Sequence, residues 1–355
     1  MNIILTILVT LVMFGFLIAL HELGHYLFAR LFGIGIIEYS IGMGPALHTW
    51  RLKHNDFSIR ALPIGGYVRM VGEPGEERPE DLPRVIGKTS INDVSVWKRM
   101  VVVLAGPLTN VLIAFFLMFL LVLTSNKLAS TTVAAFRDEN VSARYGLQVD
   151  DTILEVNGRR IHCCPDLSYA VLSDGIRPVD ILVERNGEEV LLPSVQFATE
   201  TSNGIEVGVF DFYVYEKPKT VWNLLYESFW QGWNSIYITV DSFKDLFTGR
   251  YGLDAVGGPV AVGEQVGTLL EESGSFADAL RNLGSMTVLI SASLAFMNLL
   301  PIPALDGGRF VIYLIEGIRR KPLPKKVETA MTAGTMILLL ILMAAVMLKD
   351  IIHLF

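Results

Sequence analysis

Four long apolar runs stand out along the chain, at about residues 3–32, 100–124, 286–300 and 331–348. About eighteen or more consecutive apolar residues form a helix long enough to cross a hydrocarbon core of roughly 30 Å. The third run is shorter, but apolar residues resume after an interruption that contains two prolines. The pattern therefore predicts an α-helical membrane protein with about four transmembrane helices. We expect the first run to be retained rather than cleaved as a signal peptide, because no basic residue precedes it.

Residues 33–99, between the first two runs, are polar and rich in glycine and proline. Two short strand-like stretches, Phe57–Leu62 and Tyr67–Val71, are separated by a turn signal at Pro63–Gly66. They predict a membrane-associated β-hairpin. The edge of such a hairpin could add an extended peptide by main-chain hydrogen bonding, but a purely structural hairpin has the same sequence pattern.

Residues 126–215 differ in character, because charged residues return and short strand-like runs appear. Between these runs, Asn157-Gly158 and Asn186-Gly187 are signals for tight turns. The segment therefore predicts a small soluble domain rich in β-structure, inserted between the second and third transmembrane helices.

Residues 218–248 repeat apolar and aromatic side chains at intervals of three or four, which predicts an amphipathic helix. Such a helix could lie in the membrane interface, or it could cover the small β-rich domain. Its apolar positions are Trp222, Leu225, Phe229, Trp233, Ile236, Val240, Phe243 and Phe247.

Four segments follow from this pattern. Two transmembrane helices and the loop between them occupy residues 1–125, and the β-rich domain occupies 126–215. The amphipathic helix and a connector occupy 216–283, and two further transmembrane helices occupy 284–355.

The composition agrees with a membrane protein, since 52% of the 355 residues are hydrophobic and only 18% are charged. The net charge of −7, with no basic stripe, gives no reason to expect a nucleic-acid partner. The two cysteines, Cys163 and Cys164, are adjacent, so they cannot staple the fold, and they do not fix the redox compartment.

The first apolar run leads into His21-Glu22-Leu23-Gly24-His25, an H-E-x-x-H motif. Residues four apart lie on one face of a helix, so His21 and His25 can reach one metal ion. Glu22, beside them, is placed to accept a proton from water. This is the arrangement of zinc hydrolases. Charged groups at membrane depth are costly and usually serve a function.

A metal held by two histidines needs a third ligand, and the chain offers Asp306 in an apolar setting. A carboxylate at that depth needs a partner. Binding of Asp306 to the metal would give the carboxylate its partner and the metal its third ligand. In the second apolar run, Asn110 is expected either to hydrogen-bond another helix or to face the active site.

The loop after the third membrane segment sets the orientation. With four spans, residues 33–99 and about 317–330 lie on one side of the membrane. The second of these loops is strongly basic, so the positive-inside rule makes this side cytoplasmic. The metal motif then lies near the cytoplasmic face, and the β-rich domain lies outside the cytoplasm. The basic residues are Arg319, Arg320, Lys321, Lys325 and Lys326.

These motifs together resemble the site-2 protease family (peptidase family M50), and most closely its bacterial regulator-of-sigma-E protease branch with a single PDZ domain. The resemblance rests on H-E-L-G-H at 21–25, A-G-P-x-x-N at 105–110 and N-x-x-P-x-P-x-x-D-G at 298–307. It also rests on the run from Gly146 to Gly158, which is similar to a PDZ string except that Asp150 replaces a glycine.

The resemblance implies one Zn²⁺ per chain, bound by His21, His25 and Asp306, with Glu22 as the catalytic base. It implies that Asn298, Pro301 and Pro303 help to hold the substrate, and that the hairpin around Gly65, Gly66 and Tyr67 pairs with it. Substrates of such enzymes are single-span membrane proteins, such as anti-sigma factors, or signal-peptide remnants in a bacterial inner membrane. The PDZ domain would bind peptide or act as a size filter.

Two other classes of function compete with a protease. One is a non-catalytic membrane receptor or scaffold that uses the PDZ-like domain and has a structural metal. Glu22 argues against it, because a structural site gains nothing from a base beside its ligands. The other is a metal transporter, which would need a second intramembrane cluster to relay the ion. The sequence therefore favours an intramembrane zinc metalloprotease.

Overall fold

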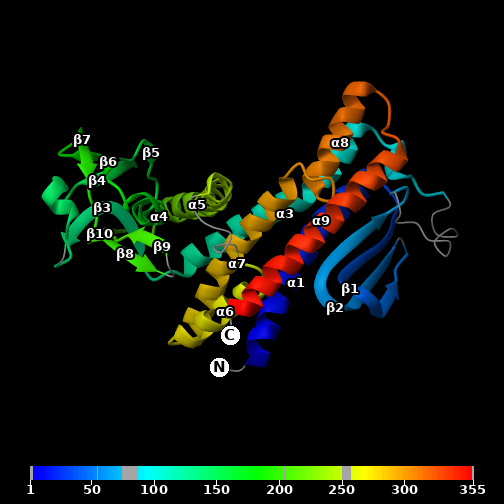
Figure 1. Cartoon of the computed structure of the whole chain (residues 1–355), viewed down its shortest axis with the longest axis horizontal. Coiled ribbons are helices and arrows are strands. Elements are labelled where there is room, and N and C mark those ends of the chain that lie inside the picture. The colour runs from blue at the N-terminus through cyan, green and yellow to red at the C-terminus, as the bar shows by residue number, and fades with distance from the viewer. Residues whose placement is uncertain are drawn as a thin grey trace. The chain divides into compact units, whose positions relative to one another are not determined.

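The computed structural model describes residues 3–53, 55–73, 87–138, 140–202, 205–249 and 257–353. The chain divides into two compact units. One consists of Met1–Ala114 and Thr239–Phe355, and the other of Phe115–Ile238. Figure 1 shows the helices and strands of each unit.

Four helices are long and apolar enough to cross a membrane: α1 (Ile3–Leu31), α3 (Val96–Thr124), α7 (Phe276–Leu299) and α9 (Lys325–His353). They confirm the expected membrane helices. Large apolar side chains such as Ile4 on α1 and Leu338 on α9 are exposed. Such residues are stable against hydrocarbon rather than water, so the chain is a membrane protein that contacts the lipid bilayer.

Two shorter helices complete the helical part of the first unit: α6 (Pro259–Glu272) and α8 (Asp306–Arg319). The sequence analysis assigned α6 to a connector. The structure packs it against α1, α7 and α9. Its first turn is capped by a buried carboxylate, because Asp350 Oδ2 accepts hydrogen bonds from the Gly258 (2.9 Å) and Ala261 (3.2 Å) backbone N–H groups.

A curved pair of strands, β1 (Ile36–Arg51) and β2 (Asp56–Met70), lies beside α1 (Figure 1). Residues 38–41 of β1 pair with two parts of β2, so that Glu38 is opposite both Arg69 and Asp56. The second half of β1 pairs with the start of β2, with Arg51 opposite Asp56. A short helix, η2 (Ile91–Asp93), follows before α3.

The predicted hairpin was wrong in its pairing. Both expected strands, 57–62 and 67–71, lie mainly in β2, and their partner is β1. Pro63–Gly66 is a bend within β2, where Gly65 has φ +83°, and the two strands instead meet at the pair of Arg51 with Asp56. Positive φ is easily adopted by glycine, so the glycine of a turn signal served here to bend a strand.

A buried carboxylate fastens this sheet together. Glu38 Oε1 accepts hydrogen bonds from Arg60 (2.6 Å) and from the Ser58 hydroxyl, and Glu38 Oε2 accepts from Arg69 (3.0 Å) and Tyr67 (3.2 Å). These partners come from both halves of β2. The network therefore ties together three neighbouring stretches of the sheet.

The second unit is built on a six-stranded sheet whose main path runs β10-β3-β4-β6-β7, with β5 beside β4. A separate pair, β8 with β9, and the helix α4 complete it, together with the short helix η3. The bounds are β3 (Leu128–Phe136), η3 (Ser142–Tyr145), β4 (Thr152–Val156), β5 (Arg159–Arg160), α4 (Cys164–Asp174), β6 (Val179–Arg185), β7 (Glu188–Val195), β8 (Thr199–Ser202), β9 (Ile205–Gly208) and β10 (Phe212–Lys217).

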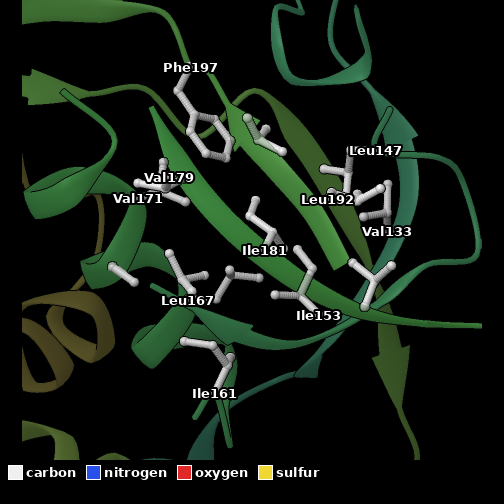
Figure 2. Close-up of a cluster of buried hydrophobic side chains, with 14 of the residues drawn as sticks. Val133, Leu147, Ile153, Ile161, Leu167, Val171, Val179, Ile181, Leu192 and Phe197 are labelled. Carbon is white, nitrogen blue, oxygen red and sulfur yellow. The ribbon is translucent and has the colours of Figure 1, made fainter. Parts of the chain in front are cut away.

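The core of this unit lies between the sheet and α4. Side chains such as Ile153, Ile181 and Leu167 are fully buried and converge there (Figure 2). Asn157 and Asn186 have positive φ, as tight Asn-Gly turns require, so the predicted turns are confirmed. The sheets described above agree with the β-rich character expected of this region.

The amphipathic helix predicted at 218–248 is present as α5 (Val221–Thr248). Within the second unit, one side of it packs on the β-rich part: Trp230 stacks on His162 with ring centroids 3.4 Å apart, and Tyr237 lies 3.7 Å from the Arg159 guanidinium. A neighbouring strip of the helix surface still exposes large apolar side chains, including Trp222 and Trp233. The helix thus covers the small domain and keeps an apolar face exposed.

Candidate active site

Helix α1 carries His21, Glu22 and His25 near its C-terminal end. The run of apolar residues before them forms an uninterrupted helix, so the four-residue spacing places both histidines on one face. Both histidine side chains are buried. Glu22 is less buried and occupies the next strip of the helix surface.

The histidine face of α1 lies against α3 at a very short distance. A β-carbon added to Gly24 would lie 2.4 Å from the Ala105 carbonyl oxygen. A β-carbon added to Gly106 would lie 2.3 Å from His25 Nε2 and 2.8 Å from His21 Cε1. Small residues let membrane helices approach this closely. Because these two glycines have no side chains, the imidazole rings can pack directly against the backbone of α3.

Helix α3 also provides a hydrogen-bond partner for each ring. His25 Nδ1 lies 2.8 Å from the Val102 carbonyl oxygen, which can only accept, so this nitrogen carries the proton. The side-chain amide of Asn110 lies 3.3 Å from His21 Nδ1. In neutral His25 the lone pair is consequently on Nε2, the atom that lies close to His21 Nε2 and Asp306 Oδ2.

The break after α7 brings Asp306 to the histidines. Pro301 and Pro303 cannot continue the helix, and the turn that follows ends at Asp306, the first residue of α8. Two glycines come next, and any side chain on them would clash: a β-carbon on Gly307 would lie 2.2 Å from Leu299 O. Because of these glycines, α8 can fold back closely on the turn.

Three ligand atoms from α1 and α8 converge on one point. His21 Nε2 lies 3.2 Å from His25 Nε2, and Asp306 Oδ2 lies 3.1 Å and 3.3 Å from these nitrogens. Asp306 Oδ2 is buried and has no hydrogen-bond partner among the described residues. Tetrahedral zinc holds N and O ligands at about 2.0–2.1 Å, which separates the ligand atoms by about 3.3 Å. The donor set and its spacing fit a zinc ion.

Glu22 lines a cavity of about 240 Å³ together with the three convergent residues. Strand β2 forms another wall, through Tyr67 and Val68. The strand also passes close to Glu22, since a β-carbon on Gly66 would lie 3.3 Å from Glu22 Cγ. A backbone extended along β2 would thus run directly beside this carboxylate.

Of the other residues predicted to hold the substrate, some line the cavity and others do not. Asn298 lines it, as does Tyr67. Gly65, Pro301 and Pro303 are not among its lining residues, and Gly65 lies against Met43 instead. Asn110 is fully buried and is not among the lining residues; its side-chain amide lies 3.3 Å from His21 Nδ1 on α1, which agrees with the expected hydrogen bond to another helix.

The structure adds two cavity residues that the sequence analysis missed, Glu73 and Arg309. They form an ion pair between the end of β2 and α8, and Glu73 is buried. Arg309 lies three residues after Asp306 on the same helix, so its proximity could have been read from helical spacing. No signal in the sequence pointed to Glu73.

Residues 9–342 match peptidase family M50. The chain is 35% identical over 357 residues to "Putative zinc metalloprotease FN1322" of Fusobacterium nucleatum, covering 99% of this chain and 100% of that protein. It is 29% identical over 346 residues to "Metalloprotease MmpA" of Caulobacter vibrioides, covering 88% and 87% of the two chains.

The matched range contains the H-E-x-x-H helix, the second helix with its glycine and asparagine, and Asp306. The match therefore includes every residue that meets at the convergent site. Together with the four apolar helices, it shows that the chain belongs to peptidase family M50, the site-2 protease family, and is a membrane-embedded zinc metalloprotease.

Proposed function

We propose that this enzyme cleaves single-span membrane proteins within or near their transmembrane segment. In this proposal His21, His25 and Asp306 hold the catalytic zinc, and Glu22 is the base. The observation that carries it is the convergence of His21 Nε2, His25 Nε2 and Asp306 Oδ2 to within 3.1–3.3 Å inside a unit of apolar helices. A buried carboxylate oxygen between two imidazoles needs a positive charge beside it, and a metal ion supplies that charge while both imidazoles stay neutral.

A zinc ion held there supplies a Lewis acid, which polarises the scissile carbonyl and lowers the pKa of water. Glu22 accepts the proton of the attacking water and delivers it to the leaving nitrogen. The walls of the cavity orient the peptide bond and keep bulk water away from it. Asn298, which also lines the cavity, offers a side-chain amide for a hydrogen bond to the substrate backbone.

Strand β2 is suited to hold an unwound substrate. Over the described residues, the stretch from Gly66 to Met70 pairs with β1, and no other strand pairs with it. A substrate strand added at this edge would gain main-chain hydrogen bonds. It would also expose a peptide bond beside Glu22, whereas the same bond within a helix is shielded by its own hydrogen bonds.

The β-rich part at about 126–215 is, in this proposal, a PDZ-like domain outside the cytoplasm. It binds peptide or excludes substrates whose outer part is still large. Asp150 occupies the position of the usual glycine with φ +72°, which is why glycine is favoured there. The basic loop at 319–326 supports a catalytic site near the cytoplasmic face of a bacterial inner membrane. The segments 1–125, 216–283 and 284–355 form the membrane-associated remainder.

The test compares detergent-purified wild type with Glu22→Gln on a tagged single-span substrate that has a short outer stub. We expect Glu22→Gln to lower cleavage by at least about 10²-fold while one zinc per chain is retained. Glu272→Gln, at the end of α6, is the matched control and should cleave normally. Unchanged turnover in Glu22→Gln would refute the role of this residue.

A second comparison tests the substrate class. The same transmembrane segment is offered with the short stub and with a folded outer domain. Preference for the short form supports a size filter, and equal cleavage of both forms argues against it. Cleavage of a soluble peptide in preference to both would overturn the intramembrane assignment.

A further inference from the structure

Asn110 occupies a position with an unusual hydrogen-bonding problem. Its side chain is completely buried, with Nδ2 3.3 Å from His21 Nδ1. Its other end, Oδ1, is buried and has no hydrogen-bond partner among the described residues. Its backbone is fixed as well, because the Ser291 hydroxyl on α7 donates to the Asn110 carbonyl oxygen at 2.8 Å.

The two histidines differ in what their second nitrogen meets. His25 Nδ1 faces a backbone carbonyl, which is always an acceptor, so the Nε2 lone pair is set without further help. His21 Nδ1 faces an amide group, which can donate or accept according to its orientation. With Nδ2 towards the ring, Nδ1 accepts and the proton of neutral His21 lies on Nε2. That tautomer cannot bind a cation through Nε2.

Rotation of the amide by half a turn about Cβ–Cγ resolves this conflict. Oδ1 then accepts from His21 Nδ1–H, and the Nε2 lone pair faces His25 Nε2 and Asp306 Oδ2. In either orientation one end of the amide has no partner, so the amide itself has little preference. Partners of this kind on metal-binding histidines fix the tautomer and the ring orientation.

We propose that Asn110 is a positioning residue for the metal site: its Oδ1 accepts the Nδ1 proton of His21 and so keeps the Nε2 lone pair on the metal. The inference rests on the proposed role of His21 as a ligand. It differs from the expectation that Asn110 faces the active site, because Asn110 does not line the cavity.

The experiment measures the zinc dissociation constant of the purified full-length protein by chelator competition. Asn110→Leu keeps the size of the side chain but removes its hydrogen bonding, and Asn110→Asp keeps acceptors and removes the donor. Thr109→Ala is the control, since it removes a γ-methyl group and a hydroxyl that is bonded within α3 to Ala105 O (2.7 Å). Should the leucine variant not fold, Asn110→Ala replaces it.

We expect Asn110→Leu to weaken zinc binding by about 10- to 100-fold, and Asn110→Asp to bind within about threefold of wild type or more tightly. Zinc binding by Thr109→Ala should not change. At saturating zinc, KM of the leucine variant should equal that of wild type, which a substrate-contacting residue would not allow. Equal weakening by leucine and aspartate, or no weakening by leucine, would overturn the proposal.

A His21→Ala variant separates this proposal from the one on which it rests. If His21→Ala keeps its full zinc content, the ligand assignment itself fails. If His21→Ala loses zinc while Asn110→Leu binds normally, only the role of Asn110 fails. A further readout is the His21 ring in ¹⁵N-labelled, zinc-loaded protein: we expect a proton on Nδ1, and a proton on Nε2 would contradict the proposal.

Discussion

Gly106 and His25 approach each other so closely that no side chain fits between them. A β-carbon on Gly106 would lie 2.3 Å from His25 Nε2. This nitrogen is also one of the three atoms that converge with Asp306. The backbone of α3 is therefore the surface against which the metal-binding rings are held.

Replacing Gly106 with alanine should accordingly damage the metal site more than the fold. The new methyl group must displace both rings, because it would also lie 2.8 Å from His21 Cε1. We expect zinc content and proteolysis to fall by about tenfold or more, as for other disturbed metal surroundings. Gly334→Ala is the control, since Gly334 in α9 has nothing within 4 Å of an added β-carbon. Normal zinc content in Gly106→Ala would contradict the close packing.

Removing the carboxylate of Asp306 should remove the metal. Asp306→Ala leaves only two nitrogen ligands, too few for a stable zinc site. Metal analysis of the purified protein should give well under one zinc per chain, and proteolysis should be lost. An Asp306→Ala protein with a full complement of zinc would mean that another residue is the third ligand.

Glu38 should be essential for the β1–β2 sheet. Its replacement by alanine leaves Arg60 and Arg69 without their buried partner, which costs about 3–5 kcal/mol of stability in comparable sites. Glu155→Ala is the comparison, because its contact with the exposed Arg160 should contribute about 0–1 kcal/mol. The loss of stability is measured by limited proteolysis of the sheet and by cleavage of substrate. Equal protease resistance and equal substrate cleavage in the two variants would refute the role of Glu38.

The same network predicts a dependence on pH. Burial opposes ionisation of Glu38, but hydrogen bonds from Ser58 and Arg60 outweigh it and hold its pKa below the usual range. A lowered pKa stabilises the fold above the unfolded value of about 4.3, and this stabilisation is lost as pH falls through the folded value. The difference in melting temperature between wild type and Glu38→Gln should therefore shrink on acidification below about pH 4. A constant difference would contradict this explanation.

The ion pair of Glu73 and Arg309 should behave as one unit. Arg309→Ala leaves the buried Glu73 carboxylate unpaired, whereas the double alanine variant removes both charges. Each loss of kcat/KM converts to a loss of transition-state free energy. We expect this loss in the double variant to be smaller than the sum of the losses in the two single variants, with a coupling of about 0.5–3 kcal/mol. Exact additivity would show that the pair does not hold β2 against α8 during catalysis.

The sequence alone determined the parts of this protein that depend on neighbouring residues. The membrane helices follow from runs of apolar residues, and the spacing in H-E-x-x-H places two histidines on one face of any helix. Asp306 followed from a chemical requirement, since its carboxylate and the two histidines each needed a partner. The Asn-Gly turns of the β-rich part are equally local, because φ above zero is restricted to few residue types.

Tertiary structure decided everything that depends on which segments meet. Gly65 belongs to a turn signal, yet it bends a strand here, because pairing between β1 and β2 fixes the register over distant residues. Helix α6, the Glu73–Arg309 pair and the position of Asn110 beside His21 depend on helix packing. Local spacing determines which residues share a face of an element. Only the close approach of α1, α3 and α8 determines what that face meets.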